Sequence, residues 1–154
     1  MTGRTVLERG RLKAYRPMPD AARRAAFSDG LAAYDRGDWF LAHELLEPAW
    51  MGAADPSERT LHSGLIKLAA AGVHGARGNP KGIVTNLVGA RARLASLVDA
   101  PVSGTGLPAP VDLPTLPAAA RIDLPALVDA IDRRLRADPA RPALDDPPAI
   151  PRRG

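Results

Sequence analysis

The sequence predicts an all-α protein: a compact bundle of two similar helical hairpins, TPR-like in appearance, followed by a proline-rich strap and a closing helix. Apolar residues recur with the 3.6-residue period of a helix in several segments, and no segment shows a convincing strand pattern. The chain has only two Phe, two Tyr and two Trp, and this small-residue composition favours closely packed helices. Two turns of similar sequence, RGD at 36–38 and RGN at 77–79, join similar helix pairs, which indicates a duplicated hairpin.

The first hairpin is expected to span two helices, at about 20–35 and 39–51. Gly37 suits the left-handed position that follows a helix, and Asp38 suits the N-cap of the next one. We therefore interpret the RGD sequence as a helix–helix turn and not as an adhesion motif.

The second hairpin repeats the same start and stop signals. Asp55 is a suitable N-cap and Pro56 a suitable first residue for a helix that continues to about residue 76. After the turn at Gly78, a fourth helix with a regular apolar face is expected at about 80–99.

The composition changes after residue 100, because eleven of the sixteen prolines lie beyond it. We expect a single helical domain at 19–137, which includes an extended strap at 100–122 and an amphipathic closing helix at 123–137. Residues 1–18 should form a basic arm, and residues 138–154 are too rich in proline and polar groups to fold, so a disordered tail is predicted there.

The net charge of +4 arises in the N-terminal arm, whereas the rest of the chain is neutral. We interpret the arm as a solvated, poorly ordered segment, and nucleic-acid binding through it stays open as an alternative. No apolar run approaches the ~20 residues of a membrane span, and the first residues lack the apolar stretch of a secretory signal. With no cysteine either, the expected location is the cytoplasm and no membrane partner is expected.

Polar side chains form two stripes at helical spacing. On the second helix His43, Glu47 and Trp50 share a face, and Glu44 lies beside them. The third helix carries a stripe that comprises Arg59, Ser63, Lys67 and His74.

A short connection makes the second and third helices antiparallel neighbours, so we expect the two stripes to face each other. Arg59 should then lie near Glu47 or Trp50, and His74 near His43 or Trp39. His62 reads as an ordinary helix residue, and Asn86 as a polar surface or hairpin-contact residue.

Two segments of the chain, YDRGDWFLAHELLEPAW and GLIKLAAAGVHGARGNPKG, resemble the domain-of-unknown-function 309 family. The pattern of this family is an H-E-x-L-E-x-x-W helix, then an arginine, then a G-L-I-Q-x-A helix that ends in a His and a G-N turn. The resemblance spans about 27–97, and 122–131 is similar to the closing element of the family. It implies a duplicated-hairpin domain of bacterial and archaeal proteins, with no established activity. Its polar set falls on His43, Glu44, Glu47, Trp50, Arg59 and His74; this chain departs from it at Ser63 and Lys67, where glutamine is frequent.

Four interpretations of these polar residues stay open. The first is a metal site, for which His43, Glu47 and His74 are weak candidates, although no known ligand motif is complete and no cofactor is expected. The second is a small hydrolase-like site, with His43, Glu44, Glu47 and Lys67 as candidate catalytic residues. The third is a binding surface formed by Trp39, Trp50, Arg59, Ser63 and His74.

The fourth interpretation is structural: His43, Glu44, Glu47, Arg59 and Lys67 would form a buried or half-buried hydrogen-bonded network that fixes how the hairpins dock. Of these we favour a non-catalytic binding module whose partner is a protein, peptide or small molecule, and the enzyme is the alternative. The sequence does not indicate an oligomeric state.

Overall fold

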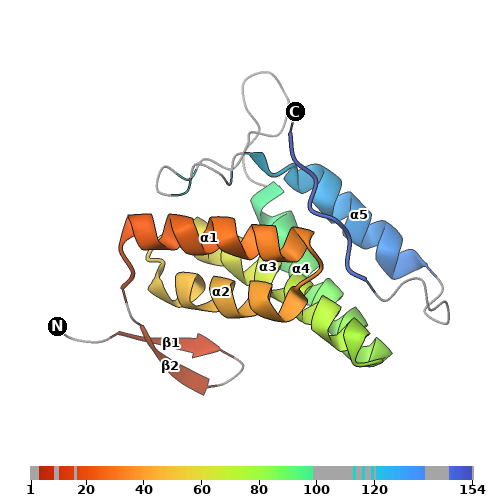
Figure 1. The fold of residues 1–154 in the computed structure, drawn as a ribbon, viewed down its shortest axis with the longest axis horizontal. Helices are drawn as coiled ribbons and strands as arrows, with labels where there is room; N and C mark the ends of the chain where they lie inside the picture. Colours follow the sequence, from red (N-terminus) through yellow and green to blue (C-terminus); the bar gives the residue numbers. More distant parts are fainter. Residues whose placement is uncertain are drawn as a thin grey trace.

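The computed structural model describes residues 17–98, 121–137 and 146–153 in full, residues 113, 116 and 119 singly, and the backbone of 4–8 and 11–15. In these parts the chain forms a helical bundle with a small β-hairpin at one end (Figure 1). The helices are α1 (Asp20–Asp35), α2 (Trp39–Gly52), α3 (Pro56–Ala76), α4 (Pro80–Val98) and α5 (Leu124–Arg136).

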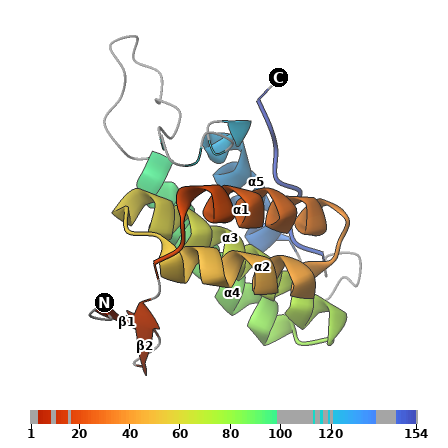
Figure 2. The same cartoon turned by 60° about the vertical axis from the view of Figure 1, so that its left-hand side comes forward.

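Each helix packs against the next helix along the chain, and this confirms the predicted all-α bundle of two hairpins with a closing helix. Helices α1 and α2 lie side by side in both views, and α5 packs against α4 (Figures 1 and 2). The core between the helices is apolar. Its largest fully buried side chains include Phe27, Leu46, Leu65, Leu87, Leu127 and Ile131.

The helix ends follow the local signals in the sequence. Asp38, Asp55 and Asp123 are N-caps, because each carboxylate accepts a hydrogen bond from the backbone N–H three residues later. Gly37 and Gly78 have φ angles of 80° and 66°, a left-handed conformation that glycine adopts without a Cβ clash.

The expectation of no strands is wrong within the N-terminal arm. Strand β1 (Arg4–Glu8) pairs antiparallel with β2 (Arg11–Tyr15), from Arg4 opposite Tyr15 to Glu8 opposite Arg11. The sequence signal is Gly10 between two short runs that contain Thr, Val and Tyr, residues that favour strands. The runs are too short for their period to distinguish them from an irregular arm.

Most of the predicted strap and residues 138–145 of the predicted tail lie outside the described residues. Where the strap is described, Leu113, Leu116 and Ile122 are buried in the core. The tail is ordered at 146–153, so the prediction of disorder is wrong for this segment, which lies beside α5 (Figures 1 and 2).

The end of the tail is bound to the bundle through its backbone. Asp123 N donates to Pro151 O at 2.9 Å, Arg153 N donates to Arg121 O at 2.7 Å, and the Tyr34 hydroxyl donates to Pro148 O at 2.7 Å. A proline-rich segment cannot form a helix, but its extended backbone leaves carbonyls available for such bonds. Long-range contacts therefore order a segment whose composition indicates disorder.

Candidate functional site

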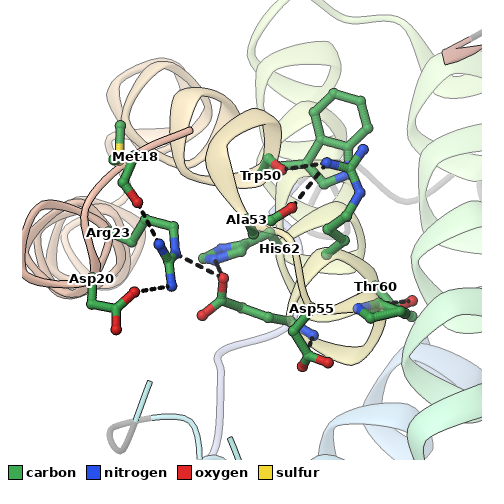
Figure 3. Close-up of polar contacts among 11 residues, drawn as sticks. Met18, Asp20, Arg23, Trp50, Ala53, Asp55, Thr60 and His62 are labelled. Carbon is green, nitrogen blue, oxygen red and sulfur yellow. Dashed lines mark hydrogen bonds and ion pairs between the residues drawn. The ribbon is translucent and has the colours of Figure 1, made fainter. Parts of the chain in front are cut away.

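Arg59, near the start of α3, lies on Trp50 at the end of α2, as the stripes predict. The guanidinium carbon of Arg59 lies 4.6 Å from the centroid of the Trp50 ring, and Nη1 donates to Trp50 O at 3.0 Å and Ala53 O at 3.2 Å. Figure 3 shows Trp50 and Ala53, whose carbonyls accept these two bonds from Arg59. The stacking and the two bonds together hold the guanidinium in one orientation.

A second guanidinium reaches the same place from α4. Arg93 Nε donates to Ser63 Oγ at 2.7 Å, and its Nη1 donates to Gly89 O at 3.0 Å. Both arginines line an open hollow of about 400 Å³ between the start of α3 and the end of α4, which we call the arginine hollow. It is lined by Trp50, Pro56, Arg59, Thr60, Ser63 and Arg93.

The arginine hollow is electrostatically one-sided. No Asp or Glu belongs to its lining, and within the described residues neither Arg59 nor Arg93 is paired with a carboxylate. Their protein partners are backbone carbonyls, an aromatic ring and a serine hydroxyl, none of which carries a negative charge. The two positive charges are therefore oriented but not neutralised by the groups that hold them.

A second hollow, of about 370 Å³, lies at the other end of the α3–α4 pair and is called here the lysine hollow. His74 lies over Gly82, and its Nδ1 is 3.1 Å from the side-chain nitrogen of Asn79. Asn86 is buried and donates to Gly82 O, one turn earlier in α4, at 2.8 Å. The lining comprises Lys67, His74, Asn79, Lys81, Gly82, Thr85 and Asn86.

The α3 stripe does not face α2 as predicted. Arg59 contacts α2, whereas Ser63 bonds to Arg93 and the His74 ring turns to Gly82, both on α4. The stem of Lys67 also lies against α4, 2.7 Å from where a Cβ on Gly89 would stand. The glycines of α4 leave the space into which these side chains fold, and helical periodicity alone does not show which neighbour has that space.

His43, Glu44 and Glu47 form a patch on α2 but line neither hollow. His43 Nδ1 lies 3.8 Å from Glu44 Oε1 and 3.7 Å from Glu47 Oε2. The Glu44 side chain is 55% exposed, and the other two are about one-third exposed or less. The predicted proximity of the three groups is confirmed. The predicted buried or half-buried network is not seen at two of its members, because Glu44 faces solvent and the described bonds of Arg59 go to neutral acceptors.

Trp39 has a packing role at the other end of α2. Its ring is in edge-to-face contact with Tyr34, with centroids 4.9 Å apart, and it lies directly on the backbone of Gly72 in α3. It lines neither of the two hollows. Of the predicted binding residues, Trp50, Arg59 and Ser63 meet in the arginine hollow, His74 lies in the lysine hollow, and Trp39 is separate from both.

The sequence interpretation missed a buried ionic cluster between α1 and α3. Arg23 Nε donates to Glu58 Oε2 at 2.9 Å, Nη2 donates to Asp20 at 2.7 Å, and Nη1 donates to the carbonyl of Met18 (Figure 3). Glu58 is fully buried and Arg23 almost so. Burial by itself lowers the pKa of Arg23, but the bonds to Asp20 and Glu58 outweigh it and raise that pKa.

His62 is a core residue and not an ordinary helix residue as predicted. Its ring is fully buried, meets Phe27 edge to face at 5.5 Å, and lies with Nε2 4.0 Å from Glu58 Oε2. Neither ring nitrogen has a hydrogen-bond partner among the described residues. Burial, together with the charges of Arg23 and Arg59, lowers the pKa of His62 to about 4, so the ring is neutral at pH 7.

A periodicity signal for this cluster does exist in the sequence. Glu58 and His62 lie four residues apart, on the same face of α3 as Leu61, Leu65 and Leu68, all of which are buried. A polar residue on an apolar face is either buried with a partner or a mark of function, and here Glu58 has the partner Arg23.

Among the described residues, no three His, Cys, Asp or Glu side chains lie close enough together to hold a metal ion. The guanidinium groups of Arg59 and Arg93 carry N–H donors of the kind that carboxylate and phosphate oxygens accept.

The comparison with known families agrees with the motif on α2. Residues 27–86 match the family model described as Domain of unknown function (DUF309). The match confirms the resemblance. The matched segment runs from α1 to the first half of α4. It includes both polar stripes and the described lining of the lysine hollow, whereas Arg93 of the arginine hollow lies beyond its end.

No curated protein and no solved structure matches the chain. In the described part of the chain, none of the helices combines the length and the apolar character needed to cross a bilayer.

Proposed function

We propose that this domain is a non-catalytic binding module that captures an anionic group of a partner in the arginine hollow. Arg59 and Arg93 would supply the donors, and Ser63 and Trp50 would position them. The carboxylate of an acidic side chain and a phosphate group share the required chemistry, because both accept two parallel bonds from a guanidinium.

One observation carries this proposal. Two guanidinium groups from different helices line one open hollow, and each is held by uncharged acceptors, with no described carboxylate beside it. Arg23, by contrast, has the buried carboxylate partner Glu58. Because the groups that orient Arg59 and Arg93 carry no negative charge, the positive charges of both side chains can attract an anionic ligand.

The enzyme alternative has less support in the arrangement of the same residues. His43, Glu44 and Glu47 are close together but lie on a partly exposed helix surface, and none of the three lines either of the two hollows. We also propose a cytoplasmic location, which the absence of cysteine supports.

The test is a titration of the ¹⁵N-labelled protein with acetyl-triglutamate, followed by NMR at the Nε–H signals of the arginines. We expect the signals of Arg59 and Arg93 to shift, and Arg93→Gln to weaken binding by about tenfold, the loss of one charge-assisted bond. Arg93→Lys should retain part of the affinity. Competition by inorganic phosphate shows whether a phosphate is accepted as well as a carboxylate.

Arg24→Gln is the matched control, because Arg24 is exposed on α1 outside both hollows. It should bind acetyl-triglutamate like the unaltered protein. Equal binding by Arg93→Gln, with an unchanged melting temperature, would exclude the arginine hollow as the ligand site.

A further inference from the structure

The lysine hollow extends the arginine hollow along the same pair of helices. The α3 stripe passes from Arg59 and Ser63 in the first hollow to Lys67 and His74 in the second. Both hollows also include residues of α4, which runs antiparallel to α3 beside this stripe.

Gly89 of α4 lies where the two hollows approach each other. A Cβ at this position would stand 2.7 Å from Lys67 Cδ and 3.4 Å from Arg93 Nη1, so one lysine-hollow residue and one arginine-hollow residue meet over it. Gly82, two helical turns earlier on the same face, leaves corresponding room for His74. Because Gly89 and Gly82 have no side chains, Lys67 and His74 of α3 can lie directly against the backbone of α4.

The charges along this surface have one sign. Arg59, Arg93, Lys67 and Lys81 all belong to the linings, and among the described lining residues there is no Asp or Glu. Asn79 and Thr85 add polar groups at the far end, which can donate to carbonyl or carboxylate oxygens. A chain with several negative charges in a row would therefore meet positive or donor groups throughout its length.

We infer that the two hollows form one basic groove along α3 and α4 and that its occupant is an extended acidic peptide segment of a partner protein. This inference rests on the proposed function and assigns its ligand class. From Arg59 to His74 the helix rises roughly 22 Å, and an extended peptide covers that length with about seven residues.

A peptide fits the groove better than a single-stranded nucleic acid does. Sequence-independent binding of single strands uses exposed aromatic rings on which bases stack. Trp50, the tryptophan of the arginine hollow, is buried and covered by the Arg59 guanidinium. The described lining of the lysine hollow includes no Phe, Tyr or Trp.

The experiment compares fluorescein-labelled oligoglutamates of three, five, seven and nine residues by anisotropy at low ionic strength. Affinity should rise from three to seven residues and then level off, because longer peptides extend beyond the groove. Lys81→Glu should weaken heptaglutamate binding by about tenfold and leave triglutamate binding unchanged. Arg93→Gln should weaken the binding of both peptides.

Arg24→Glu is the matched control, since it changes the net charge by the same amount on α1. If heptaglutamate binds no more tightly than triglutamate, or if Lys81→Glu behaves like Arg24→Glu, the extended groove is wrong while the arginine hollow stands. If Arg93→Gln has no effect even on triglutamate, the proposed function fails as well. Tighter binding of a seven-nucleotide RNA, with the same sensitivity to Lys81→Glu, would replace the peptide as the occupant.

Discussion

Arg23 of α1 and Glu58 of α3 form an ion pair inside the bundle, with Nε donating to Oε2 at 2.9 Å and both side chains buried. This pair connects the first hairpin to the second. It also explains why a full carboxylate lies next to His62 in an otherwise apolar core. Charged groups in such a core are stable only while each has its partner.

Glu58→Gln should therefore destabilise the protein by about 3 kcal/mol, because it leaves the buried Arg23 charge without its carboxylate in the core. Urea denaturation followed by circular dichroism gives the free energy of unfolding. Glu44→Gln, the same change at an exposed position of α2, should alter it by less than about 0.5 kcal/mol. Equal effects of the two changes would contradict a stabilising role of the buried pair.

The stability of the protein should fall in mild acid because of His62. The folded state binds a proton there only near pH 4, whereas an unfolded histidine does so near its ordinary value of 6.5. Between these pH values the unfolded state binds more protons, so the free energy of unfolding falls by about 1.4 kcal/mol for each pH unit as the pH decreases. The contribution is complete above pH 6.5 and is lost as the pH approaches 4.

Denaturation curves of His62→Leu between pH 4 and 7 measure this contribution by difference. The charged groups around the ring, Glu58, Arg23 and Arg59, are present in both proteins. The variant should lose about 3 kcal/mol of the pH-dependent change. His74→Gln, at a partly exposed histidine, should keep the full dependence; a His62→Leu protein with an unaltered pH profile would assign the acid sensitivity to other groups.

Gly72→Ala should destabilise the contact between α2 and α3 by about 1–3 kcal/mol, because the added methyl group would overlap the Trp39 indole. Thermal unfolding of the two single variants and the double variant Trp39→Ala/Gly72→Ala measures the coupling. Gly72→Ala should lower the melting temperature much less in the Trp39→Ala background than in the unaltered protein. Additive effects would show that the tryptophan is not the obstacle.

A chain that ends at residue 145 should be less stable by about 2 kcal/mol. It would lose the buried Ile150 side chain, the bond from Tyr34 to Pro148 and the ion pair of Arg152 with Asp35, whose atoms lie 2.9 Å apart. Tyr34→Phe in the full-length protein should account for about 1 kcal/mol of this. Urea denaturation of both proteins tests the prediction, and identical midpoints for the chains 1–145 and 1–154 would show that the tail does not stabilise the bundle.

The sequence by itself determines the local architecture. The caps at Asp38, Asp55 and Asp123 and the turns at Gly37 and Gly78 depend on hydrogen bonds and φ angles within a few residues, so the residue types predict them directly. The stacking of Arg59 on Trp50 is predictable for a similar reason, because the short α2–α3 connection fixes how these neighbours meet.

Only the tertiary structure decides which of the polar groups meet. Ser63 lies toward α4 because it accepts a hydrogen bond from Arg93, and His74 does so because Gly82 leaves room for its ring. Glu58 is buried with a partner because Arg23 of α1 donates to its carboxylate. The ordered tail at 146–153 likewise depends on Tyr34, far away in the sequence. These arrangements depend on burial and pairing between segments that are distant in the sequence. A local sequence pattern does not show which distant segments meet, so it does not predict them.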